Sequence, residues 1–162
     1  MISYFKKGVS LVEVLIGAAI IAVAFVAIMN AYGFFITMET RTANLAKASF
    51  MTEEGLEVVR FNRDSSWNTN ILTKSTSTTY YLSFATTSRV WSFVTSPVID
   101  DGFTRTVNFY DVKRDGSTGD IIAAGGAVDS NIKKIKVMVS WSEQGVTTSK
   151  SISTYLSNIY DN

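Results

Sequence analysis

The sequence has no cysteine, no histidine and a single proline, Pro97. Without cysteine, the chain cannot form disulfides or present a thiol nucleophile. Without cysteine and histidine it also cannot build a Cys–His metal site or a Ser-His-Asp triad. An enzyme of this composition would depend on carboxylate chemistry, and no pair of carboxylates stands out in the sequence. We therefore expect no enzymatic activity, no cofactor and no bound metal.

The sequence also lacks a strong net charge. Its 15 basic and 14 acidic residues give a formal charge of +1. Removal of the first eight residues would take away Lys6 and Lys7 and leave 13 basic and 14 acidic side chains. Neither balance creates bulk attraction for nucleic acid, so we do not expect nucleic acid as a partner. With 162 residues, the chain is long enough for one domain and an anchor.

A long apolar run lies near the N-terminus. From Val14 to Met29 sixteen consecutive residues have no polar side chain, and the apolar character continues to Ile36. A helix over these 23 residues, Val14 to Ile36, would be about 35 Å long, enough to cross a bilayer core of about 30 Å. Because no proline follows before position 97, we predict one helix over residues 9–62, roughly 54 residues and about 80 Å long.

The second half of this predicted helix is amphipathic. A bare helix in water is not independently stable, so this half needs a partner surface. Gly33 and Gly55 each cost about 1 kcal/mol relative to alanine and are candidate positions for a bend or local melting. The apolar residues that recur at helical spacing are Met38, Leu45, Ala48, Leu56 and Val59.

The hydrophobic period changes to two after Trp67. The Ser/Thr/Asn-rich residues 68–79 predict a loop, and the last two strands should form an antiparallel hairpin that places Ile135, Val137, Val139 and Trp141 on one face. The sequence thus predicts an α+β fold, in which the long N-terminal helix packs on a C-terminal antiparallel β-sheet of about four to five strands. The strands are expected at 80–84, 90–94, 103–109, 134–141 and 146–156.

Glu13 is a lone carboxylate at the edge of the apolar run. An ionised carboxylate costs on the order of 2.5–3.5 kcal/mol at the centre of a membrane helix and less near the interface. Two interpretations follow from its position. Either Glu13 lies among lipid headgroups and ends the span, or it awaits a cationic partner from another molecule.

Residues 6–16, Lys-Lys-Gly-Val-Ser-Leu-Val-Glu-Val-Leu-Ile, resemble the class III leader and N-terminus of type IV prepilins and type II secretion pseudopilins. The resemblance implies that a membrane-embedded prepilin peptidase cuts after Gly8 and methylates the new amino terminus, Val9. It also implies that Glu13 pairs with the terminal amine of a neighbouring subunit. An α-amino group with a pKa of about 7.7–8.0 is a suitable cation for a buried acid. Val9 departs from the phenylalanine that is commonest there in the family.

Two further stretches carry weaker resemblances to the same family. Residues 53–67 are similar to the junction of helix and head in bacterial prepilins, and residues 139–159 resemble the C-terminal strands of minor pilins and minor pseudopilins. The family implies the pilin fold and a structural subunit of a pilus or secretion filament, built from other pilin subunits on an inner-membrane assembly platform. The domains would be a leader (1–8), a transmembrane and assembly helix (9–36), its amphipathic continuation (37–62) and a globular β-sheet head (63–162).

This resemblance also implies a location. The precursor would cross the inner membrane once, in contact with lipid, and then enter an extracellular or periplasmic filament. A rival from another class is a signal-anchored cell-surface binding module that does not polymerise. It predicts an uncut N-terminus and indifference to Glu13.

Two charged clusters in the predicted head are candidate sites. Some secretion pseudopilins hold calcium in loops that resemble the stretch with Asp111, Asp115, Gly116 and Asp120. The EF-hand template fails, however, because Lys113 and Ile122 occupy ligand positions, so a turn with solvated acids is the preferred interpretation.

The second cluster is basic. Lys133, Lys134 and Lys136 would either contact phosphates or, as we prefer, protect an outward face or sheet edge from aggregation. The nearby residues 123–126 lack a Walker or Rossmann spacing and predict a flexible loop.

Overall fold

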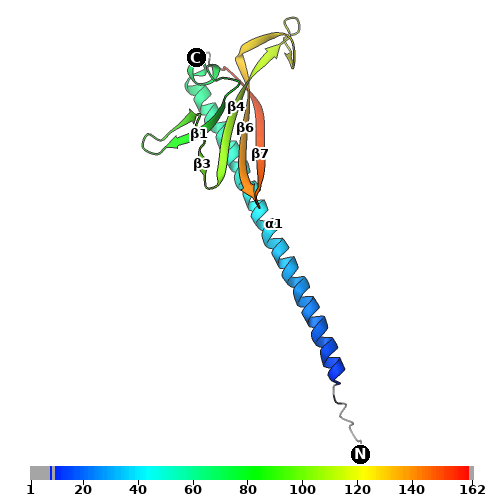
Figure 1. The fold of residues 1–162 in the computed structure, drawn as a ribbon. Coiled ribbons are helices and arrows are strands. Elements are labelled where there is room, and N and C mark those ends of the chain that lie inside the picture. The colour runs from blue at the N-terminus through cyan, green and yellow to red at the C-terminus, as the bar shows by residue number, and fades with distance from the viewer. Residues whose placement is uncertain (1–7, 9, 161–162) are drawn as a thin grey trace, which may run out of the picture. The chain divides into compact units, whose positions relative to one another are not determined.

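The computed structural model describes residue 8 and residues 10–160. Its main helix, α1 (Leu11–Ser65), is 55 residues long and continuous, as Figure 1 shows. The chain divides into two compact units, one ending at Ala43 and the other beginning at Asn44. The helix α1 contributes residues to both units.

The first unit consists of the N-terminal part of α1. The carbonyl oxygen of Ser10 accepts hydrogen bonds from the N–H groups of Glu13 and Val14 at 3.0 and 3.2 Å, which closes the first helical turn. Helical structure continues through Gly33, so this glycine does not mark local melting. The predicted helix over residues 9–62 is thereby confirmed, with bounds that differ by two or three residues at the ends.

The second unit contains an antiparallel sheet with the strand order β2-β1-β4-β6-β7, and β3 and β5 each pair with β4. The five strands on the main path match the five that the alternation predicts. The sequence did not predict β3 and β5, because two residues are too few to show a period. The strands are β1 (Thr79–Ala85), β2 (Val90–Val94), β3 (Ile99–Asp100), β4 (Phe103–Arg114), β5 (Ile121–Ile122), β6 (Ala127–Glu143) and β7 (Val146–Ser157).

The β6–β7 hairpin confirms the clearest prediction. Glu143 pairs with Val146, so only Gln144 and Gly145 form the turn. Both have positive φ values, 51° and 81°, as a type I′ turn requires. The predicted inward residues of β6 are buried, because alternation along a strand puts every second side chain on the same face.

The inner face of the sheet packs against the part of α1 that follows Asn44. Ala48, Leu56 and Val59 are buried there, as predicted. Met38 and Leu45 are 45% and 39% exposed, so the expectation that they belong to the packed stripe is wrong. Leu45 precedes the first fully buried position, and Met38 lies in the first unit.

The segment after α1 also differs from the prediction. Part of the expected loop at 68–79 is a π-helical turn, η1 (Asn68–Leu72). Ile71 in this turn is fully buried with Trp67, and the Trp67 indole donates a hydrogen bond to the Ser130 carbonyl oxygen at 2.9 Å. The polar composition of residues 68–79 predicts a loop, but the buried side chains of Trp67 and Ile71 fix this segment to the core.

Gly55 has a packing role rather than the predicted weakening role. It is buried within continuous helix. A Cβ atom at this position would lie 2.8 Å from Val137 Cγ1 and 3.0 Å from Arg105 Cδ. The missing side chain therefore allows α1 to approach β6 closely.

Candidate functional site

The residues implicated by the N-terminal motif lie at the start of α1. Gly8 is exposed and precedes the helix, whereas Val9 and residues 1–7 lie outside the described residues. Glu13 is exposed in the first turn. The free N–H groups of a helix N-terminus favour a negative charge at this place. Cleavage after Gly8, methylation of Val9 and intermolecular pairing of Glu13 stay predictions.

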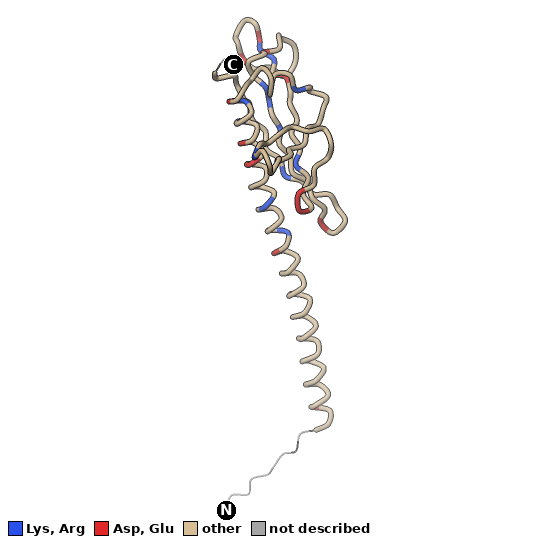
Figure 2. The backbone as a smooth tube through the Cα atoms, turned by 90° about the vertical axis from the view of Figure 1, so that its left-hand side faces the viewer, with Lys and Arg blue, Asp and Glu red and all other residues tan. Residues whose placement is uncertain are grey.

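The apolar surface after Glu13 is uncovered. An 18-residue window of α1 has a mean hydropathy of 2.8, and none of it is buried. By length and composition the helix can cross a membrane. The corresponding part of α1 is almost free of charge colour in Figure 2. Since burying one large apolar side chain contributes about 1.5–3 kcal/mol, covering this surface with lipid or protein would be favourable.

Inside the head, the buried cation Arg105 of the sheet forms an ion pair with α1. Arg105 in β4 donates from Nη1 to Glu54 Oε2 of α1 at 2.7 Å, and their side chains are 7% and 52% exposed. The guanidinium also lies 5.2 Å from the Trp91 ring, and its Nε is buried without a hydrogen-bond partner among the described residues. Arg105 alternates with Phe103 and Val107 along β4, so its inward position could be read from the sequence, whereas its partner on α1 could not.

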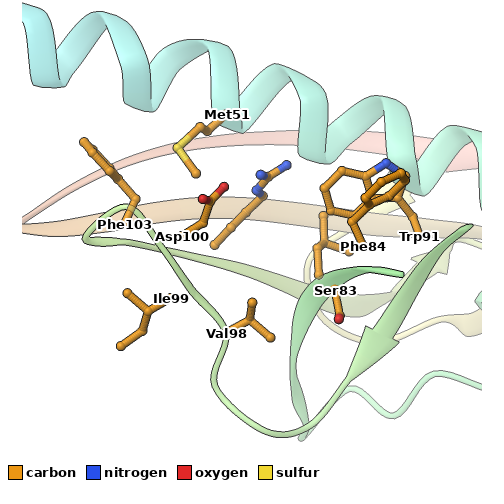
Figure 3. A pocket seen from close by; sticks show the side chains of 10 residues that line it. Met51, Ser83, Phe84, Trp91, Val98, Ile99, Asp100 and Phe103 are labelled. Atoms are coloured by element: carbon orange, nitrogen blue, oxygen red, sulfur yellow. The ribbon is translucent and has the colours of Figure 1, made fainter. Parts of the chain in front are cut away.

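Next to this arginine lies a cavity of about 280 Å³ between α1, the β1–β2 hairpin and the β2–β4 connection. Figure 3 shows Met51 and Phe103 at one end and the Phe84 and Trp91 rings at the other. Asp100 and Ser83 supply polar atoms. Asp100 is the one carboxylate among the lining residues, and no hydrogen bond between it and Ser83 is found within the described part of the chain.

The acidic side chains of the expected loop do not gather at one site. Asp111 belongs to β4 and accepts a hydrogen bond from Lys133 Nζ at 2.6 Å, so its assignment to a solvated turn is wrong. Asp115 instead organises the turn: its Oδ1 accepts the N–H groups of Ser117 and Thr118 at 2.7 and 3.2 Å. These bonds lower the pKa of Asp115. Among the described residues no three acids, histidines or cysteines form a metal site.

The three lysines of the basic cluster lie on two different faces of the sheet. Lys133 is buried on the inner face, where a partner at Asp111 compensates its charge. All three lysines lie within β6, which is an interior strand between β4 and β7. The sheet-edge part of the interpretation is therefore wrong, and the outward-face part fails for the buried Lys133 but holds for Lys134 and Lys136. Lys134 and Lys136 lie on the opposite, outer face, because they differ from Lys133 by one and three positions.

An ion pair fixes the base of the connection between β4 and β6. Arg114 Nε donates to Asp129 Oδ2 at 2.6 Å, and Arg114 Nη1 donates to the Gly119 carbonyl oxygen at 2.6 Å. The hydrogen bond from Arg114, together with one from the Asn131 N–H, lowers the pKa of Asp129. Residues 123–126 have no regular secondary structure, in agreement with the predicted loop.

Comparison with known proteins adds no family assignment: no protein-family model, curated protein or solved structure matches this chain. The class defined by the structure is an α+β protein with a long apolar N-terminal helix and a helix-on-sheet domain. The family resemblance of residues 6–16 remains a prediction from the sequence.

Proposed function

We propose that the chain is a structural subunit, a pilin or pseudopilin, of a filament assembled from the inner membrane. The observation that carries the proposal is the exposed apolar surface of α1, with a single carboxylate in its first turn. Lipid would cover this surface in the precursor. Neighbouring helices would cover it in the filament, where the head domains would lie outside.

Glu13 would set the axial position of neighbouring subunits. Cleavage after Gly8 frees an amine on Val9, and an amine with a pKa of about 7.7–8.0 is substantially cationic at neutral pH. An unpaired carboxylate within a bundle of apolar helices is costly. Assembly would therefore favour the arrangement in which each Glu13 meets the terminal amine of its neighbour.

The test uses the full chain expressed together with a prepilin peptidase and an assembly platform. Glu13→Ala should leave the precursor inserted and cleaved but reduce its recovery in sheared filaments at least tenfold. Glu39→Ala is the matched control, since Glu39 is another exposed carboxylate of α1. Normal incorporation of the Glu13 variant would contradict the pairing role.

A second variant tests processing separately. Gly8→Ala should block cleavage, so that intact-mass analysis finds the full-length chain with no methylation at Val9. The rival function, an anchored binding module that does not polymerise, predicts that the wild-type chain keeps its first eight residues. It also predicts that Glu13→Ala has no effect.

A further inference from the structure

The outer face of the sheet, which points away from α1, has an unusual chemical composition. The residues that alternate with the buried ones on β4, β6 and β7 are mostly serine, threonine and tyrosine, for example Ser149, Ser151 and Ser153. Between the β-bulge at Asp111/Val112 and the β6–β7 turn, the only charged outer-face residues of these strands are Lys134 and Lys136. This face offers hydroxyl groups and positive charge without an opposing carboxylate.

Two shallow hollows meet at Lys134. The first, of about 450 Å³, is lined by Tyr110, Lys134, Lys136, Ser151 and Ser153. The second, of about 380 Å³, shares Lys134 and adds Lys113 and Tyr155. Its one carboxylate, Asp111, is already bound to Lys133.

The strand register puts a tyrosine on each side of the shared lysine. Tyr110 pairs with Lys134 across β4 and β6, and Lys134 pairs with Tyr155 across β6 and β7. The two tyrosines are 40% and 51% exposed. No ion pair or hydrogen bond of the Lys134 or Lys136 side chain is found within the described part of the chain. The ammonium group of Lys134 and the rings of Tyr110 and Tyr155 are thus accessible to a ligand.

We propose that this outer face binds an acidic polysaccharide. Lysine ammonium groups make charge-assisted hydrogen bonds with carboxylates, tyrosines supply flat apolar surface with a polar tip, and the serines can exchange hydrogen bonds with sugar hydroxyls. Three lysines along two adjoining hollows suit a single polymer chain with one charge per sugar, whose charges lie farther apart than those of a duplex. A nucleic acid duplex carries one charge per about 1.7 Å, and its protein partners commonly neutralise 6–10 phosphates. The cations present here are too few for that.

The experiment measures binding of the full chain, purified in detergent, to polygalacturonate at low salt. Neutral dextran and single-stranded oligothymidylate are the comparison polymers. The Lys134→Gln/Lys136→Gln variant should weaken polygalacturonate binding about tenfold, which corresponds to a loss of about 1.4 kcal/mol for two exposed ion pairs together. Lys150→Gln is the matched control. It removes an exposed lysine from β7 at a position that pairs with the inward-facing Val139.

We expect binding to polygalacturonate that weakens with added salt. The Lys150→Gln variant should bind polygalacturonate like the wild type, and dextran should bind weakly. Three results would overturn the proposal: no polygalacturonate binding, equal binding of dextran, or tighter binding of oligothymidylate. Tyr155→Ser provides a second variant and should weaken binding without changing its salt dependence. The proposal does not depend on filament assembly, since Glu13→Ala should bind polygalacturonate like the wild type.

Discussion

The ion pair between α1 and the sheet supports a prediction about the relative cost of removing each partner. Arg105 is buried, with 7% of its side chain exposed, while the Glu54 side chain is 52% exposed. The two deletions therefore leave very different residues behind. Glu54→Ala leaves a buried guanidinium whose Nε already has no hydrogen-bond partner in the part of the chain that the structure describes. Arg105→Met leaves a carboxylate that water can solvate.

The magnitudes follow from this asymmetry. Breaking a fully buried pair from one side costs about 3–5 kcal/mol. Because Glu54 is half exposed and water can replace part of its contribution, we expect about 1–3 kcal/mol for Glu54→Ala. Arg105→Met exchanges a buried charge for an apolar chain of similar length. It should therefore cost less than about 1.5 kcal/mol.

The assay is urea unfolding of the full chain in detergent, followed by tryptophan fluorescence. Trp67 and Trp141 are both buried and report on loss of the core. The control is Glu57→Ala, whose exposed pair with Arg60 should be worth less than about 1 kcal/mol. If Arg105→Met were more destabilising than Glu54→Ala, the pair would be a net source of stability and the reasoning would be refuted.

Two further predictions concern packing and pH. Gly55→Ala should lower the unfolding free energy by up to about 2 kcal/mol, because overpacking of about 1–3 kcal/mol against Val137 exceeds the gain of about 1 kcal/mol in helix propensity. Gly33→Ala, with open space around it, should leave head unfolding unchanged; a stabilised Gly55→Ala protein would contradict the close approach of helix and sheet. The lowered pKa of Asp129 should contribute stability that is fully present above its unfolded value of 3.8 and is lost as the pH falls through the lower folded value. Melting temperatures between pH 2 and 6 should therefore fall less steeply for Asp129→Asn, and an unchanged slope would exclude the contribution.

The sheet could be predicted from the sequence because its strands are long and its inner face is apolar. In β6 the alternation from Ile135 to Trp141 is uninterrupted, and the two-residue turn at Gln144 and Gly145 has the residue types that a hairpin favours. Both signals are local, so a single sequence contains them. The helix was predictable for the same reason.

The buried charges could not be predicted in the same way. Lys133 occupies an inward position by the same alternation that places Ile135, but a lysine favours an outward interpretation. Its partner Asp111 lies 22 residues away, and Glu54 lies 51 residues from Arg105. Pairing of this kind depends on the register between distant elements, which hydrophobicity along one strand does not specify.

The Asp111–Lys133 pair also explains how the register between β4 and β6 is made unique. A slip by one residue would turn the apolar side chains outward, so hydrophobic alternation already excludes it. A slip by two residues would keep every apolar side chain inward and is not excluded by alternation. That slip would place the buried Lys133 opposite Phe109 instead of Asp111, at the cost of an unpaired buried cation, which is several kcal/mol. We therefore interpret the Asp111–Lys133 pair as the feature that distinguishes the native register from its nearest apolar alternative.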